Sequence, residues 1–216
     1  MSKKKVIVFG ATGSLGKYIV KALMNVNSAE VTLFVRNKAK LSSDAISKCH
    51  VVVGDALNED DVRKAIQGQD IVYTGMSGDL DKMSEILVKA MQSVGVNRII
   101  AISSMGIYGA YWKATFIDTK HAPGFINSIF LTLMRGLFPV YRRLADRIEA
   151  SGLCYTILRP GRFTEVDEVN YQLTYKGEPE RGRDISRKSI AAFVAKIIEN
   201  PEKYANKNIG ITRRNG

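Results

Sequence analysis

Short, uninterrupted apolar runs alternate along the chain with segments whose apolar residues recur every three or four positions. Runs of the first kind, rich in β-branched residues, are typical of strands buried on both faces of a sheet, whereas the second kind is typical of amphipathic helices. The expected strands cover 5–9, 31–35, 51–53, 71–73, 98–103 and 155–158, with further strands at 171–175 and 208–212. The expected helices cover 14–24, 58–67 and 80–94, a stretch from Pro139 to the stop at Gly152, and 186–199.

Residues at the ends of these helices fit their positions. Asn58 is suited to accept hydrogen bonds from the first-turn amides of its helix, and Ser186 is suited to do the same for another. Gly95 follows the last apolar residue of a third helix, where glycine commonly ends a helix. Because strands and helices alternate, we predict a doubly wound α/β fold, the Rossmann fold, with a mostly parallel sheet and helices on both faces. The length of 216 residues fits a single domain.

Two stretches, 104–138 and 163–184, lack this regular pattern. We expect them to form the substrate side of the site, because specificity in such folds lies in loops. Within the first stretch, apolar residues from Phe125 to Leu137 recur at helical intervals. They indicate either a helix that covers the substrate side of the sheet or a surface for a homodimer, and the spacing does not separate the two. Arg135 interrupts this segment, which is also too short to cross a membrane.

Charge and cysteine content narrow the class of partner. The chain has 32 lysine and arginine residues and 21 aspartate and glutamate residues, a formal net charge of +11. The densest basic clusters lack the interleaved aromatic side chains on which bases stack, so an anionic small ligand is expected rather than nucleic acid. Cys49 and Cys154 lie far apart, and the N-terminal apolar run is too short for a signal peptide. We therefore expect a cytoplasmic protein.

A glycine-rich loop lies between the first predicted strand and the first predicted helix. Glycines let the backbone turn tightly and approach a pyrophosphate, whose charge is met by amides at the helix N-terminus, and the third glycine lets helix and strand pack closely. This G-x-x-G-x-x-G pattern predicts a dinucleotide-binding site, and the alternative is a tight turn that binds no ligand. The site residues expected here are Gly10, Thr12, Gly13, Ser14, Leu15 and Gly16.

The second predicted strand ends at Arg36, about twenty residues past Gly16, where such folds place the side chain that reads the adenosine ribose. A guanidinium suits a 2′-phosphate, whereas an acid would suit the 2′-hydroxyl of NAD, so Arg36 favours NADP. Asn37 and Lys38 are placed to contribute, and the alternative is a solvated arginine at a strand end. Asp55, after the third strand, is suited either to hold the adenine amino group or to stabilise a turn.

These motifs, taken together with Gly54-Asp55-Ala56-Leu57, Ser103-Ser104 and Leu158-Arg159-Pro160-Gly161, resemble the atypical short-chain dehydrogenase/reductases. Within them the chain is similar to the NmrA-like, NAD(P)H-binding proteins, which include biliverdin-IXβ/flavin reductases. The resemblance covers essentially the whole chain. It implies adenine contacts from Asp55 and Ala56, and it places further residues along the cofactor or beside its nicotinamide: Gly75, Met76, Ser77, Ser103, Pro160, Gly161 and Arg162.

Catalytic residues are less clearly marked. Typical members of the wider superfamily use a serine and a Tyr-x-x-x-Lys motif, in which the lysine lowers the tyrosine pKa so that its hydroxyl transfers a proton. None of the nine tyrosines has lysine four residues later. Tyr141 lies on about the right helix and is the candidate proton donor, with packing as the alternative. Ser104 is a candidate for orienting the substrate, or a strand-end cap, and Tyr108 is a candidate for stacking on a planar substrate.

The two histidines suggest no further catalytic group or metal site. His121, in the long loop, is a proton-donor candidate or a solvated side chain, and His50 precedes a core strand. The histidines and cysteines are scattered and no carboxylate pair accompanies them, so no metal site is expected.

The sequence thus predicts an NAD(P)H-dependent oxidoreductase that transfers a hydride from NADPH to a small-molecule acceptor. Without Tyr-x-x-x-Lys, the acceptor is expected to need little acid catalysis, as a flavin, quinone, tetrapyrrole or carbonyl compound would. The missing motif fits equally an NmrA-like redox sensor that binds NADP and passes its occupancy to a regulatory protein partner. A nucleotide-sugar epimerase-like enzyme is the third reading.

Overall fold

The computed structural model describes residues 3–108 and 138–214. Its centre is a sheet of eight strands in the order β3-β2-β1-β4-β5-β6-β10-β8, and only β8 runs antiparallel to its neighbour. The strands are β1 (Lys4–Phe9), β2 (Ala29–Val35), β3 (His50–Val53), β4 (Ile71–Thr74), β5 (Arg98–Ile102), β6 (Cys154–Pro160), β8 (Gln172–Tyr175) and β10 (Lys207–Thr212).

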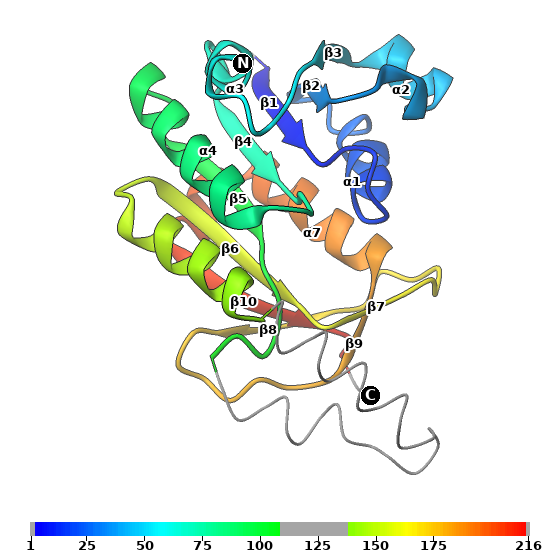
Figure 1. Ribbon diagram of the computed structural model, residues 1–216. Coiled ribbons are helices and arrows are strands. Elements are labelled where there is room, and N and C mark those ends of the chain that lie inside the picture. Colours follow the sequence, from blue (N-terminus) through cyan, green and yellow to red (C-terminus); the bar gives the residue numbers. More distant parts are fainter. Residues whose placement is uncertain (1–2, 109–137, 215–216) are drawn as a thin grey trace, which may run out of the picture.

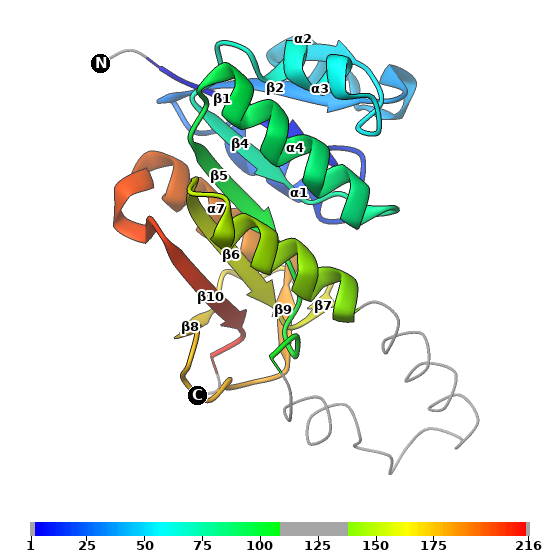
Figure 2. The ribbon, with the colours of Figure 1, turned by 60° about the vertical axis from the view of Figure 1, so that its left-hand side comes forward.

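Helices cover both faces of this sheet (Figure 1 and Figure 2). On one face, α1 (Gly16–Leu23) packs against α7 (Arg187–Glu199). On the other face, α3 (Glu59–Ile66) packs against α4 (Leu80–Val94), and a helix over 138–150 lies beside them.

The central strands are buried by both helical layers. In β1, Val6 and Val8 belong to the core that includes α1 and α7, whereas Ile7 and Phe9 belong to the core that includes α3 and α4. Successive side chains of a strand point to opposite faces of a sheet, so an uninterrupted apolar run is what a doubly covered strand requires. The predicted Rossmann fold is confirmed.

The helix ends follow the predicted capping residues. The Asn58 side chain accepts hydrogen bonds from the amides of Asp60 (3.0 Å) and Asp61 (3.2 Å) at the start of α3. The Ser186 hydroxyl accepts from the amide of Ser189 (3.0 Å) at the start of α7. Gly95 ends α4 with φ +73°, a left-handed conformation that favours glycine.

Several short elements were not predicted. The helix α2 (Ser43–Lys48) buries only Ala45, so it has no apolar stripe that a periodic pattern could reveal. Within the stretch 163–184 and at its edges, β7 (Arg162–Thr164) and β9 (Asp184–Ser186) pair as a separate two-stranded parallel sheet, too short for a visible alternation. Two single turns of 3₁₀-helix complete the described elements, η1 (Lys38–Lys40) and η3 (Pro201–Tyr204).

Some predictions concern residues that the structure does not describe. The apolar segment from Phe125 to Leu137, most of the stretch 104–138 and His121 lie outside the described residues. Among residues 3–108 and 138–214, no helix is long and apolar enough to cross a membrane. Within the same residues, no three or more histidine, cysteine or acidic side chains are grouped so as to hold a metal ion.

Candidate functional site

Two adjoining cavities lie at the carboxyl ends of the parallel strands, the edge at which open α/β sheets bind ligands. The first has a volume of about 190 Å³ and the second about 380 Å³. They meet at the glycine loop and at the turn after β4, because the same four residues line both: Gly13, Gly75, Met76 and Ser77.

The glycine loop lies against the turn after β4 with no room for side chains. Gly10 has φ +89°, and a Cβ atom there would lie 2.5 Å from the carbonyl oxygen of Gly75. A Cβ atom on Gly16 would overlap the carbonyl oxygen of Gly10. Gly16 lines neither cavity, so its place in the motif is explained by the close packing of helix and strand.

The first cavity contains the predicted adenosine-side residues. From the loop come Gly10, Thr12 and Gly13; from the other strand ends come Arg36, Asp55, Ala56, Gly75, Met76 and Ser77. The Asp55 carboxylate also accepts a hydrogen bond from the Leu57 amide (3.0 Å), so this residue stabilises a turn while it lines the cavity. The two interpretations of Asp55 are therefore compatible.

Lys40 was missed by the sequence reasoning, which named Lys38 instead. Asn37 accepts a hydrogen bond from the Ala39 amide (2.9 Å) and caps η1, and this turn brings Lys40 back to the cavity beside Arg36. Lys38 is absent from the residues that line the cavity. Arg36 and Lys40 are both exposed, and within the described residues neither has a carboxylate partner. The cap at Asn37 was the available signal for this turn.

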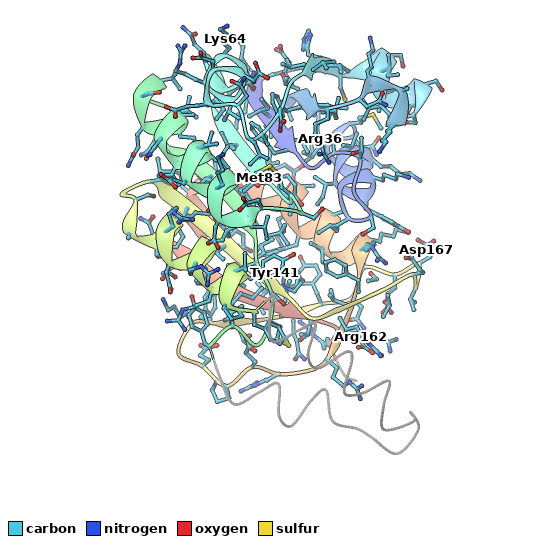
Figure 3. The ribbon with its side chains drawn as sticks, in the orientation of Figure 1. Arg36, Lys64, Met83, Tyr141, Arg162 and Asp167 are labelled. Carbon is cyan, nitrogen blue, oxygen red and sulfur yellow. The ribbon has the colours of Figure 1, made fainter. Side chains whose placement is uncertain are left out.

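The second cavity contains the residues expected beside the nicotinamide. Figure 3 labels Arg36 and Met83, which line the first cavity, and Tyr141 and Arg162, which line the second. The predicted residues that line only the second cavity are Ser14, Leu15, Ser103, Ser104, Tyr141, Pro160, Gly161 and Arg162. Three apolar side chains that the sequence reasoning did not name complete it: Ile102, Met105 and Phe163.

Three polar side chains of this second cavity have hydrogen-bond partners within the protein. The Ser103 hydroxyl donates to the backbone carbonyl of Tyr141 (3.1 Å), and the Ser104 hydroxyl donates to that of Met105 (3.2 Å). Burial raises the pKa of Tyr141, so its hydroxyl stays protonated at neutral pH. Arg162 is the single charged residue among the described residues lining this cavity. Its Nε and Nη2 atoms donate to the Asp184 carboxylate, at 2.9 and 3.0 Å.

Tyr108 lies away from both cavities. Its hydroxyl accepts a hydrogen bond from the Asn208 side chain (2.7 Å), and its ring lies 4.4 Å from the guanidinium carbon of Arg142. Arg159 and Lys176 also lie near the ring, at 5.2 and 4.9 Å. This position differs from the expected one beside the substrate, because the ring already packs against three cations. The structure therefore brings Ser104 and Tyr141 together and leaves Tyr108 apart.

The chain is similar to known proteins over most of its length. A family model described as NAD(P)H-binding matches residues 10–201. Oxidoreductase aprR of Aspergillus flavus is 34% identical, with 96% of this chain and 68% of that protein aligned. Quinone oxidoreductase 2 of Escherichia coli is 27% identical, with 89% and 63% aligned. The chain thus spans about two thirds of the length of these relatives.

Solved structures show the same fold over nearly the whole chain. A Rossmann-fold NAD(P)-binding family protein from Shigella flexneri is 36% identical, with a TM-score of 0.78, and the match covers 99% of this chain and 97% of that one. A short-chain dehydrogenase/reductase from Veillonella parvula, solved in complex with NADP, is 21% identical, with a TM-score of 0.81 and coverage of 99% and 95%.

Proposed function

Because the chain belongs to the NAD(P)H-binding family, we propose that it is an oxidoreductase that binds NADPH and reduces an uncharged, planar acceptor such as a quinone or a flavin ring. The observation that carries this proposal is the pair of adjoining cavities, one flanked by two unpaired cations and the other largely apolar. The cavities share the glycine loop, so a dinucleotide lying across it would have its adenosine in one and its nicotinamide in the other.

The preference for NADPH is inferred from Arg36 and Lys40. A 2′-phosphate carries two negative charges at most, and a guanidinium and an ammonium without carboxylate partners are well suited to bind it. The loop leads directly into α1, which begins at Gly16, and amides at the start of a helix favour a pyrophosphate. When bound, the cofactor supplies the hydride, and the protein's residues bind and orient the two reactants.

The acceptor class is inferred from the charge of the second cavity. Its only charged side chain in the described residues, Arg162, is paired with Asp184, so the cavity offers no free cation to an anionic group. Leu15, Met105 and Phe163 favour an apolar, planar molecule. One relative is named quinone oxidoreductase 2, and this name supports the same class of acceptor.

Reduction of a quinone to a hydroquinone takes one hydride from the cofactor and one proton from a donor. In this proposal the protonated hydroxyl of Tyr141, a residue that lines the second cavity, donates a hydrogen bond to the acceptor oxygen as charge develops there. Ser104, which lines the same cavity, would orient the acceptor or the cofactor amide. The weak acid catalysis of this arrangement suits an acceptor that is itself easily reduced.

NADPH oxidation with a panel of acceptors tests the proposal. We expect turnover with menadione and riboflavin, and slower turnover with flavin mononucleotide, whose phosphate finds no free cation. Tyr141→Phe should lower kcat by about tenfold while the Kd of NADPH is unchanged, because it removes one hydrogen bond to developing charge. The control is Tyr155→Phe, which alters a tyrosine outside both cavities. Tight NADPH binding without turnover of any acceptor would contradict the proposal and favour the dinucleotide sensor.

A further inference from the structure

Arg159 and Glu180 form a buried ion pair beneath the second cavity. Their side chains are 2% and 9% exposed, and neither residue lines either cavity. The Arg159 guanidinium also donates to the side-chain oxygen of Asn208 (2.9 Å), a residue of β10. Burying a charge is unfavourable unless it is paired and hydrogen-bonded, so this pair demands an explanation beyond filling space.

The pair connects the two walls of the cavity. Arg159 directly precedes the wall formed by Pro160, Gly161 and Arg162. The Glu180 carboxylate accepts a hydrogen bond from the backbone amide of Gly106 (3.2 Å), the residue that follows the wall formed by 103–105. In Figure 1 the chain after β5 (green) and the chain between β8 and β9 (orange) both reach this end of the sheet.

Backbone hydrogen bonds join the same two walls directly. The Ser103 amide donates to the carbonyl of Leu158 (2.7 Å), and the Met105 amide donates to that of Pro160 (3.0 Å). The donors of these two bonds lie beyond the last paired residue of β5, and the contact from Glu180 holds the residue after Met105, Gly106. The Glu180 side chain therefore adds one more contact between the two walls, just beyond the backbone hydrogen bonds that join them.

We infer that Arg159 and Glu180 are positioning residues for the acceptor: Arg159 fixes Glu180, and Glu180 fixes the turn at Gly106 so that Ser104 and Met105 keep their places in the second cavity. The inference rests on the proposed function only in taking the second cavity as the acceptor site. No residue of the pair or of its hydrogen-bond partners lines the first cavity, so the pair should affect the acceptor and leave the cofactor's adenosine side unchanged.

Kinetics of Glu180→Gln test this role. The glutamine still offers an oxygen to Gly106 but leaves Arg159 without a counter-charge. We expect the KM for menadione to rise by about tenfold, because small displacements of positioning groups have large effects on rate, and the Kd of NADPH to change by less than about twofold. The matched control is Glu85→Gln, which removes an exposed ion pair with Lys89 on α4 and should change neither constant.

A second variant separates positioning from a general loss of stability. The double variant Arg159→Met with Glu180→Gln removes the unpaired buried charge, so it should recover most of the free energy of unfolding lost by Glu180→Gln alone. Its KM for menadione should stay raised, because no side chain then fixes the residue at position 180. Equal losses of acceptor and NADPH binding in Glu180→Gln, or an unchanged KM, would overturn the inference.

Amide hydrogen exchange gives a readout that needs no acceptor. In Glu180→Gln, exchange should increase over 102–108 and 160–164 and stay unchanged over 10–16. Unchanged exchange in the two walls would overturn the inference, whatever the enzyme reduces. Increased exchange there, in a protein whose wild type reduces no acceptor, would support the ion pair's role and refute the proposed function.

Discussion

At the scale of single residues, a buried hydroxyl next to the turn after β4 lowers the free energy of unfolding. The Tyr73 hydroxyl, on β4, is fully buried and lies 2.8 Å from where a Cβ atom of Gly75 would be. Among residues 3–108 and 138–214 it has no hydrogen-bond partner. A buried hydroxyl without a partner destabilises the folded state by roughly 1–3 kcal/mol. Its ring nevertheless fills the space that the glycine at 75 leaves.

Tyr73→Phe should therefore raise the free energy of unfolding by about 1 kcal/mol at neutral pH, measured by urea denaturation. Burial also raises the pKa of Tyr73 in the folded state. Ionisation of Tyr73 does not affect the free energy of unfolding below the unfolded pKa of about 10. Above that pH the free energy of unfolding falls, because only the unfolded tyrosine ionises. The phenylalanine variant should thus lose less stability above about pH 10 than the wild type. A variant less stable at neutral pH would show that the hydroxyl has a partner.

At the scale of secondary-structure elements, the sequence was most informative where an apolar pattern and an end signal coincide. The helix α4 has the predicted bounds, 80–94, because its apolar stripe is long and Gly95 ends it with a positive φ. The short elements α2, β7 and β9 bury too few residues to leave a pattern, and their positions depend on distant partners. Local chemistry therefore predicts long elements and their ends, whereas short ones follow from tertiary contacts.

The cap of α3 is a direct test at this scale. Asn58→Ala removes the acceptor for two amides and should lower the free energy of unfolding by about 1 kcal/mol in urea denaturation. Asn58→Ser, which retains a capping oxygen, should stay close to the wild type. An equal loss in both variants would show that the contribution of Asn58 comes from contacts other than the cap.

At the scale of the whole molecule, the site arises because the ends of six parallel strands meet at one edge of the sheet (Figure 1). Residues directly after strands could therefore be predicted, and almost all of the expected cofactor residues line the two cavities. Lys40, which was missed, and Tyr108, which lies apart from the cavities, both come after strand ends. Lys40 depends on the turn at η1, and Tyr108 is held by Asn208, one hundred positions later in the chain. Such contacts follow from the folded topology and leave no local signal in the sequence.

Calorimetric titration with NADPH and with NADH tests the central claim, that these cavities bind a dinucleotide with a 2′-phosphate. The wild type should bind NADPH more tightly than NADH, and Arg36→Ala should weaken NADPH binding by about tenfold or more with little effect on NADH, because a charge-assisted contact to the phosphate is lost. Lys38→Ala, a loss of positive charge two residues away and outside the cavity, should change neither affinity. Equal affinity of the wild type for both dinucleotides, or binding of neither, would contradict this account of the site.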